Sequence, residues 1–577
     1  MKPHYSNEKA VQIVIALLKK NNISRIIVSP GSANDTFVYS VQSDSFFTLY
    51  SCVDERSAAY MACGIAEETN EPVVISCTGA TASRNYIPAL TEAFYRKLPI
   101  IAITATRPTM YVGHNIDQLM DRSVSLKDAI KFSVNLPVVN SEEEFWDCEI
   151  KINEAISELT KNGGGPVHLN LPTKYDRDYS FSTLPNVRQI RRYDYDSILP
   201  ELNGKKIAIY IASHKTMSDR LVNLIDEFCE KYNSVVFCEH TSGYDGKYKM
   251  PFHIVASQQG VINEFIPDIE IELGGISGIF RMPAKSIWRV AEDGQIRDPQ
   301  KKITKVFSMK EETFFEKYNS LEAEKKETNY FNNCQAKLTN IRAKVPENLP
   351  FSNLYVASKL SSKLPANSVM HFGILSSLRC WNYFQLDSSI KCYSNIGGYG
   401  IDGCISSLIG ASLIHPDKLY FGSFGDLAFF YDMNSLGNRH IGNNLRILLI
   451  NNGMGGEFKN YFSAANDFGD ESSPYICAEG HYGNKSKQLL KHYVEDLGFE
   501  YISASNKEEF DNEYMHFVSP ELMEKPILFE VFTDALVDSD ALKIINNIEV
   551  SASNGMKNMI KNIIGTNNVN KIKKAIK

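Results

Sequence analysis

The chain has 577 residues and a formal net charge of −7, with 43% hydrophobic and 22% charged residues. This is the composition of an ordinary folded protein, and it excludes wholesale disorder, a collagen-like repeat and a coiled-coil rod. The mild acidic excess argues against nucleic acid as the main partner, because proteins that bind nucleic acid need a basic surface. At roughly 100–200 residues per domain, the length predicts three or four domains.

The sequence lacks the usual patterns of secretion, structural zinc and membrane insertion. The eleven cysteines lie between Cys52 and Cys477 without a C-x-x-C pair, a spacing that suits neither a disulfide framework nor a zinc site. The first twenty residues do not have the order of a signal peptide. No run reaches the ~18 apolar residues of a membrane span. We therefore expect a soluble, cytoplasmic protein without a transmembrane segment.

Short apolar runs alternate with helix-like stretches along the whole chain. This alternation predicts parallel sheets that are covered by helices on both faces. A charged stretch at 310–345 reads as a helical linker. The predicted strands are 25–31, 72–79, 99–108 and 165–172 in the first third, 207–213, 234–240, 268–275 and 302–309 in the middle, and 368–375, 391–398, 418–426, 445–453 and 525–534 in the last third.

We predict an α/β protein made of three doubly wound parallel-sheet domains and a basic tail. The predicted boundaries are 1–182 for the first domain, 183–345 for the central domain, 346–550 for the last domain and 551–577 for the tail. Within the tail, residues 556–577 contain six lysines and no acid, with isoleucines at helical spacing. Two interpretations stay open: an interfacial or partner-binding helix, or a frayed or locally packed terminal helix.

Oxygen-bearing side chains follow two predicted strands of the last third. Ligands of open parallel sheets bind beyond the carboxyl ends of the strands. Asp426 closes one strand and Asn452 follows the next, with the Met454 carbonyl two residues further on. Mg²⁺ prefers such oxygen ligands when a diphosphate supplies the remainder. The alternative is that Gly-Asp and Asn-Asn are simply common turn dipeptides.

Two further segments suggest ligand contacts. The glycine-rich turn 395–403 enters a small-residue helix at 404–412, and backbone N–H groups at such a helix start can hold an anion. In the first third, Glu55 stands at a strand end before an apolar helix, where partial desolvation would keep it protonatable near neutral pH. The alternative is that Asp54 caps the helix and Glu55 is a solvated acid of its first turn.

These motifs occur in the same order in one family. VDERSAA at 53–59, YSNIGGYGIDG at 393–403, GDLAFFYDMNSL at 425–436 and NNGMGGEF at 451–458 resemble the thiamine-diphosphate (ThDP) enzymes of the pyruvate oxidase and decarboxylase superfamily. Within it, the sequence is most similar to the MenD family, the 2-succinyl-5-enolpyruvyl-6-hydroxy-3-cyclohexene-1-carboxylate (SEPHCHC) synthases of menaquinone synthesis. The likeness covers the first and last thirds well and the middle third faintly.

The resemblance implies a role for each matching residue. Glu55 is the catalytic acid that hydrogen-bonds the aminopyrimidine ring of ThDP, and Ile401 is the apolar wedge that bends the cofactor. Asp426, Asn452 and the Met454 carbonyl would hold Mg²⁺ on the diphosphate. The implied cofactor-binding set is Pro30, Gly31, Thr78, Gly79, Ser394, Asn395, Ile401, Asp426, Leu427, Asn452 and Met454.

The resemblance also implies the reaction type and the assembly. Such an enzyme decarboxylates a 2-oxo acid donor and transfers the remaining carbon nucleophile to a small-molecule acceptor, or protonates it. In the family the glutamate and the diphosphate site come from different subunits. A homodimer, alone or as a dimer of dimers, is therefore the expected active unit.

The substrate positions depart from the MenD pattern. Ala33 and Ile396 stand where the pattern has arginines, and Glu457 stands where it has an apolar residue. Because arginine binds carboxylates by a rigid two-point fork, neither replacement can do the same. The candidate substrate residues are Ser32, Arg107, Gln118, Lys285, Arg379 and Glu457.

These departures suggest a decarboxylase or carboligase with a smaller or less acidic substrate, and with an acceptor such as a sugar derivative. One alternative is authentic MenD-type synthesis, which depends on 2-oxoglutarate and isochorismate. A second alternative is a ThDP-binding protein without catalysis. The presence of Glu55 argues against this last possibility, because the role of that acid is chemical rather than architectural.

Overall fold

The structure is a computed structural model in which residues 2–258, 262–322, 329–481 and 485–549 are described. The chain divides by packing into two compact units: Met1–Ser197 with Asp293–Ser308, and Ile198–Glu292 with Met309–Lys577. The basic tail predicted at 551–577 lies outside the described residues. No helix in the described part of the chain is both long enough and apolar enough to cross a membrane.

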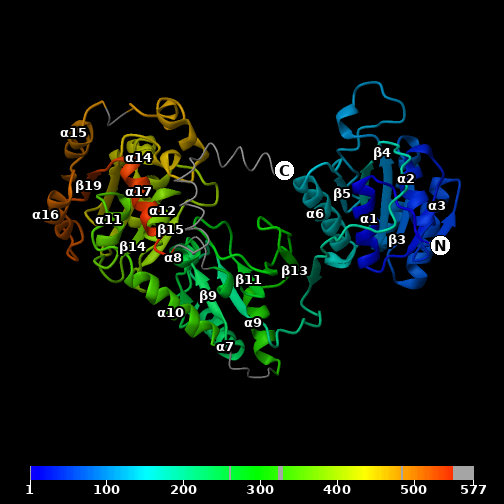
Figure 1. Ribbon diagram of the computed structural model, residues 1–577, viewed down its shortest axis with the longest axis horizontal. Coiled ribbons are helices and arrows are strands. Elements are labelled where there is room, and N and C mark those ends of the chain that lie inside the picture. The colour runs from blue at the N-terminus through cyan, green and yellow to red at the C-terminus, as the bar shows by residue number, and fades with distance from the viewer. Residues whose placement is uncertain (1, 259–261, 323–328, 482–484, 550–577) are drawn as a thin grey trace, which may run out of the picture. The chain divides into compact units, whose positions relative to one another are not determined.

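The first unit is built on a six-stranded sheet in the order β2-β1-β3-β4-β6-β5, with every pairing parallel. Helices α1 and α6 cover one face and α3 covers the other (Figure 1). Helix α5 packs with α3 on that second face. Adjacent residues of β1 divide between the two cores, Ile26 on the α1 side and Ile27 on the α3 side. The elements are α1 (Lys9–Lys20), β1 (Arg25–Val28), α2 (Asp35–Gln42), β2 (Thr48–Ser51), α3 (Glu55–Thr69), β3 (Val73–Thr78), α4 (Thr81–Asn85), α5 (Ile87–Arg96), β4 (Ile100–Thr106), β5 (Phe132–Asn135), α6 (Glu142–Glu158) and β6 (Val167–Pro172).

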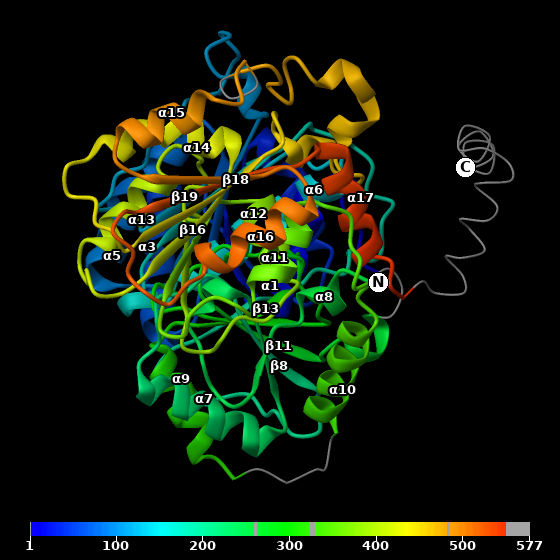
Figure 2. The same ribbon diagram turned by 90° about the vertical axis from the view of Figure 1, so that its left-hand side faces the viewer.

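A second six-stranded parallel sheet lies in the last third of the chain, in the order β15-β14-β16-β17-β19-β18. Helices α11, α16 and α17 pack on one face, and α13, α14 and α15 pack on the other (Figure 2). Leu448 and Leu449 of β17 point into these opposite cores. The elements are α11 (Asn353–Leu360), β14 (Val369–Phe372), α12 (Ser376–Trp381), β15 (Lys391–Ser394), α13 (Cys404–Ser412), β16 (Tyr420–Gly425), α14 (Asp426–Asp432), β17 (Leu445–Asn451), α15 (Leu489–Asp496), β18 (Glu500–Ala504), α16 (Lys507–Phe517), β19 (Ile527–Phe532) and α17 (Ala535–Ile545).

The middle of the chain contributes further parallel strands. In the second unit these have the order β10-β9-β8-β11-β12, and in the first unit β13 pairs with β7. Helix α7 packs against α9, while α10 packs against α8. The elements are β7 (Arg191–Tyr193), β8 (Ile207–Ile211), α7 (Asp219–Tyr232), β9 (Val235–Cys238), β10 (Lys249–Met250), α8 (His253–Ala256), β11 (Ile269–Leu273), β12 (Ile287–Val290), β13 (Ile303–Phe307), α9 (Glu311–Ser320) and α10 (Tyr330–Ala343).

The predicted fold class is confirmed: the sheets are parallel throughout and are covered by helices. Each apolar run predicted as a strand contains one, because a strand buried on both faces needs a nearly continuous apolar sequence. The charged stretch 310–345 contains α9 and α10. Parallel packing also has a consequence for function, since it brings the carboxyl ends of all strands in a sheet to one edge.

Candidate functional site

The carboxyl edge of the first sheet gathers several of the predicted cofactor residues. Gly31 follows β1 and contacts Thr78 at the end of β3, where a Cβ added to Gly31 would lie 2.6 Å from the Thr78 Cβ. No larger residue fits this approach without displacing its neighbour. Pro30, just before Gly31, is exposed. The Thr78 Oγ1 is buried and has no hydrogen-bond partner among the described residues, so a polar group is available for a ligand.

Glu55 begins α3 directly after the edge strand β2. Asp54 caps this helix, with its Oδ1 accepting a hydrogen bond from the Ser57 N–H at 3.2 Å. The Glu55 Oε2 accepts from Asn85 Nδ2 at 3.1 Å, and the side chain is half-buried. The cap therefore sets the helix start, and it leaves the Glu55 carboxylate partly accessible within its own unit.

Gln118 and Arg107 lie in loops at the same edge. The Gln118 carbonyl would be 3.0 Å from a Cβ added at Gly79, which follows β3. The Arg107 guanidinium lies 3.6 Å from Asp117 and 5.0 Å from the centre of the Tyr175 ring, while its buried Nε has no partner in the described chain. The third candidate substrate residue of this unit, Ser32, is exposed at the first turn after Gly31.

Arg122 is a buried cation at this edge that the sequence did not single out. It donates from Nε to Asn170 Oδ1 at 2.6 Å and from a terminal nitrogen to Ser83 Oγ at 3.0 Å. It also lies 3.4 Å from a Cβ added at Gly79. Burial lowers the pKa of Arg122 to about 10. A lone arginine in a loop carries no pattern that could have revealed this position.

Asp426 connects the ends of two neighbouring strands in the last sheet. It begins α14 after β16, where its Oδ1 accepts from the Leu427 N–H at 2.8 Å and its Oδ2 accepts from the Gly453 N–H, beyond β17, at 2.7 Å. Burial raises the pKa of Asp426 to about 7, and the backbone donors act in the opposite direction. The result is a buried, oriented carboxylate of the type that can bind a divalent cation.

Asn452 lies next to Asp426 in this arrangement and has a partner that the sequence did not indicate. Its Nδ2 donates to Asp538 Oδ2 at 3.0 Å, and its Oδ1 accepts weakly from the Met454 N–H at 3.4 Å. Asp538 also accepts from the Asn353 N–H at 2.7 Å. Burial raises the pKa of Asp538 to about 6. The sequence does contain a signal for Asp538, since this acid lies four residues beyond Asp534, just after a predicted strand.

The glycine-rich turn between β15 and α13 is held by its own asparagine. Asn395 Nδ2 donates to the Gly403 carbonyl at 3.1 Å and to Ser407 Oγ at 3.0 Å. The Ser394 Oγ is buried without a partner in the described residues. Ile401 is partly buried against the core of the sheet. A Cβ added at Gly397, Gly398 or Gly403 would meet no atom within 4 Å, so the turn is open on that side.

Of the remaining predicted substrate residues, two meet and one lies apart. Arg379 of α12 forms an ion pair with Glu457, at 2.8 Å. Lys285 instead precedes β12 at the amino-terminal edge of the middle strands, where its 68% exposed side chain pairs with Asp268 at 2.7 Å. The structure therefore places Arg379 and Glu457 together and leaves Lys285 away from them.

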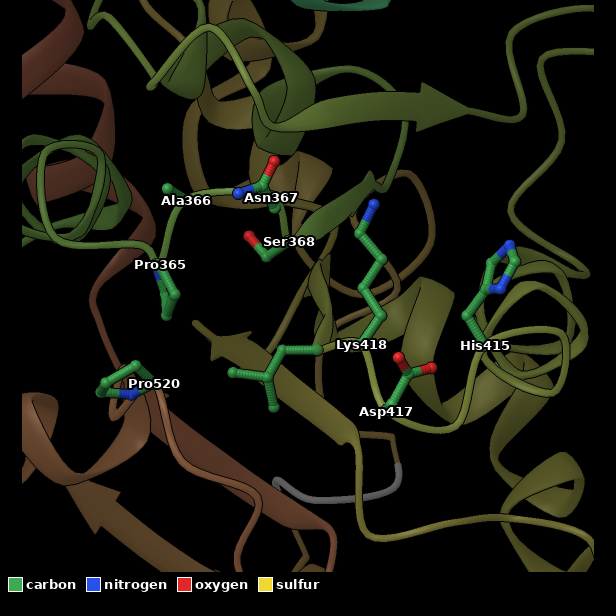
Figure 3. Close-up of a pocket in the computed structure, with 9 residues that line it drawn as sticks. Pro365, Ala366, Asn367, Ser368, His415, Asp417, Lys418 and Pro520 are labelled. Atoms are coloured by element: carbon green, nitrogen blue, oxygen red, sulfur yellow. The ribbon is translucent and has the colours of Figure 1, made fainter.

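The pocket in Figure 3 belongs to a different part of the last sheet. Its volume is about 460 Å³, and it includes Ser368 before β14 and Lys418 before β16. These residues mark the amino-terminal ends of the strands, opposite the edge that carries Asp426. The pocket is therefore separate from the candidate cofactor residues.

The chemistry of the donors can be compared with what Mg²⁺ and a diphosphate require. The described residues contain no group of three or more His, Cys, Asp and Glu side chains that could hold a metal ion. Asp426, Asn452 and the Met454 carbonyl are one carboxylate, one amide and one backbone oxygen, a set that needs further oxygens from its ligand. With the Ser394 hydroxyl, which has no partner among the described residues, this set of the second unit is compatible with a diphosphate and Mg²⁺.

Comparisons with known proteins decide the family. Residues 8–125 match the thiamine pyrophosphate enzyme, N-terminal TPP binding domain. The chain is 31% identical over 568 residues to a SEPHCHC synthase of Bacteroides fragilis and 33% identical over 570 residues to one of Phocaeicola vulgatus; each alignment covers 93% of this chain and 98% of the relative. The chain belongs to the SEPHCHC synthase family of ThDP enzymes. A relative from Christiangramia forsetii is 26% identical, with the same coverage.

Family membership confirms three predictions: the recognition of a MenD-like ThDP enzyme, the cofactor thiamine diphosphate and an activity that makes or breaks C–C bonds. The comparisons do not support the expected change of acceptor to a sugar derivative. They favour the alternative that the sequence left open, a MenD-type synthase, since the similarity extends over nearly the whole length of the relatives.

Proposed function

We propose that this protein is a Mg²⁺- and ThDP-dependent synthase of the SEPHCHC type, which joins a decarboxylated 2-oxo acid to a small unsaturated carboxylate acceptor. The observation that carries the proposal is similarity to SEPHCHC synthases over 93% of the chain. Glu55, Asp426 and Asn452 support it, because each lies at the carboxyl edge of a parallel sheet, where ligands of such sheets bind.

When bound, ThDP supplies the carbon nucleophile of this reaction, and the protein supplies orientation and proton positions. Glu55 would hold a proton toward the aminopyrimidine ring. Asp426, Asn452 and the Met454 carbonyl would hold Mg²⁺ against the diphosphate. Ile401 and Leu427 would contact the cofactor through their apolar side chains. The remaining candidates of the cofactor set would contact the two ends of ThDP through backbone and hydroxyl groups.

We further propose that the chain has three domains, 1–182, 183–345 and 346–550, and acts as a homodimer or a dimer of dimers. Each domain contains most of the strands of one parallel array, which supports the division. The assembly rests on the family resemblance, in which the glutamate and the diphosphate site come from different subunits. For substrate contacts, Arg107 and Gln118 are the candidates of the first domain, and Arg379 and Glu457 those of the last.

The test is an assay of the purified chain with ThDP, Mg²⁺, 2-oxoglutarate and isochorismate. We expect CO₂ release in equal amount to the isochorismate consumed, together with a product whose mass is the sum of the two substrates minus one CO₂. Parallel reactions with pyruvate as donor, and with an aldehyde or a sugar nucleotide as acceptor, measure the selectivity. Faster turnover with these compounds would contradict the proposal, and ThDP binding without CO₂ release from any 2-oxo acid would indicate a non-catalytic protein.

A further inference from the structure

The ion pair between Arg379 and Glu457 joins one guanidinium nitrogen to both oxygens of a largely buried carboxylate. A single guanidinium nitrogen of Arg379 donates to both carboxylate oxygens of Glu457, at 2.8 and 2.9 Å. The side chains are only 11% and 21% exposed. Arg379 belongs to α12, which follows β14, whereas Glu457 lies three residues beyond Met454 after β17. The pair therefore stands at the carboxyl edge of the last sheet, beside the segment expected to hold the cation.

Arg379 has aromatic neighbours in addition to its carboxylate. Its guanidinium carbon lies 5.5 Å from the centre of the Phe280 ring and 5.4 Å from that of Phe462, which is the range of cation–π contacts. Phe280 in turn stacks on His253, with ring centres 5.6 Å apart and planes 6° from parallel. Phe280 and Phe462 remain 37% and 41% exposed, so the site has an open face beside the guanidinium.

Glu457 is held by more than the arginine. Its Oε2 also accepts from Ser376 Oγ at 2.8 Å and from Asn460 Nδ2 at 3.0 Å. Burial alone lowers the pKa of the Arg379 guanidinium, but the charge and hydrogen bonds of Glu457 outweigh burial and raise it. The carboxylate thus engages one nitrogen of the guanidinium and neutralises its charge, as a bound carboxylate ligand would.

A ligand carboxylate could bind Arg379 only at the expense of this pair. Displacing Glu457 would leave a largely buried carboxylate with its arginine engaged elsewhere, and breaking a buried pair is strongly unfavourable. Sharing the guanidinium would place two carboxylates within a few ångströms of one another, where like charges repel. An uncharged polar group meets neither penalty.

We propose that Glu457 is a specificity-determining residue, a built-in carboxylate that neutralises Arg379 and excludes a substrate carboxylate from this position. The substrate group that meets the pair is then uncharged and able to form hydrogen bonds, such as a hydroxyl or a carbonyl. This inference rests on the proposed function in one respect, that the open face beside Arg379 belongs to the substrate site. The carboxylates of the proposed substrates are bound elsewhere, for example by Arg107.

The test measures anion binding without turnover. Isothermal titration calorimetry of the full chain with ThDP and Mg²⁺ uses succinate as the probe and succinamide as its uncharged counterpart. We expect Glu457→Gln to bind succinate at least tenfold more tightly than the wild type, with no gain for succinamide. The gain should disappear in the double variant Glu457→Gln/Arg379→Gln. Glu524→Gln, which removes an exposed acid of the same chain, is the matched control.

A second variant guards against misfolding of the first. Ser376→Ala removes one hydrogen bond to Glu457 while it keeps the charge, so it should strengthen succinate binding in the same direction but by a smaller factor. Equal succinate affinity in the wild type, Glu457→Gln and Ser376→Ala would overturn the proposal. So would a gain that survives the loss of Arg379.

The same variants separate this inference from the proposed function. If the proposed function is correct, Glu457→Gln should also raise kcat/KM for 2-oxoglutarate relative to pyruvate, mainly through KM. If no 2-oxo acid is turned over but Arg379-dependent succinate binding increases, the proposed function fails and the inference stands. If turnover is as proposed but the donor ratio and the succinate affinity do not change, the inference fails alone.

Discussion

The first and last sheets share one strand order but present different chemistry at the same edge. Their orders, β2-β1-β3-β4-β6-β5 and β15-β14-β16-β17-β19-β18, are identical when the strands of each sheet are counted along the chain. In the first sheet the candidate catalytic acid, Glu55, follows the edge strand β2. In the last sheet Asp426 follows β16, which has neighbours on both sides. The same strand order therefore places Glu55 beside an edge strand and Asp426 beside an interior strand.

The difference in position accounts for the difference in environment. Asp426 receives N–H groups from its own helix start and from the end of β17, and it is 5% exposed. Glu55 accepts a side-chain hydrogen bond from Asn85 and remains half-buried. A buried, backbone-oriented carboxylate suits a fixed cation, whereas a more accessible carboxylate suits contact with a ligand that arrives from outside the unit.

The largest expected effect is on CO₂ release, and it follows from a change at Glu55, beside the edge strand of the first sheet. Glu55→Gln keeps the shape of the side chain but cannot exchange a proton, so we expect CO₂ release to fall by about 10²–10⁴-fold. Titration of ThDP should show an affinity within about threefold of the wild type, since a single contact changes little else. Glu68→Gln, on the exposed end of the same helix, is the control. Full turnover in Glu55→Gln would remove the proposed proton role.

The next largest expected effect is on ThDP affinity, and it follows from a change at Asp426 in the last sheet. Asp426→Asn removes the only carboxylate of the proposed Mg²⁺ set, so ThDP affinity at fixed Mg²⁺ should fall about 100-fold, or ~2.7 kcal/mol, as measured by calorimetry. Asp417→Asn is the control, because Asp417 lines the pocket at the opposite edge of the sheet (Figure 3). If the two variants bound ThDP equally well, the cation would have to be held by other residues.

The smallest expected effect is on the pH dependence of stability, and it concerns one buried histidine in each sheet. Burial lowers the pKa of His168 on β6 to about 3 and that of His371 on β14 to about 4. Both pKa values lie below the unfolded value of about 6.5, so the unfolded state binds more protons and stability falls as pH decreases below 6.5. For each histidine we expect a loss of about 0.7 kcal/mol between pH 7 and pH 6.

Urea unfolding at these two pH values measures that loss. His168→Gln should reduce the pH dependence of the first unit and His371→Gln that of the second, whereas His415→Gln, at an exposed site, should leave both unchanged. His168 hydrogen-bonds Thr104 Oγ1 at 2.7 Å and Ser133 Oγ at 3.2 Å, but the Nε2 of His371 has no partner in the described chain. An unaltered slope in both variants would mean that neither ring remains neutral.

Most of the predicted strands are buried in their sheets, although the partly exposed edge strand β15 was predicted as well. β4 and β17, for example, are buried at every residue and read as continuous apolar runs. The strands that the sequence did not predict include β2, β5 and β18, which lie at sheet edges, and also β12, which is buried at every residue. β2 has the sequence Thr48–Ser51, with three of its four residues exposed, so no apolar pattern identifies it. At an edge, pairing with one neighbour decides the strand, and that neighbour is distant in sequence.

The candidate site shows the same difference between what local sequence indicates and what contacts between distant residues decide. Glu55, Asp426 and Asn452 could be found from the chain because each follows its own strand within a few residues, and parallel strands present their carboxyl ends together. The contacts of Asn452 with Asp538 and of Arg379 with Glu457 could not, since they join residues 86 and 78 positions apart. Local pattern determined which residues follow the carboxyl ends of the strands, while the packing of strands and helices decided which of them are paired with one another.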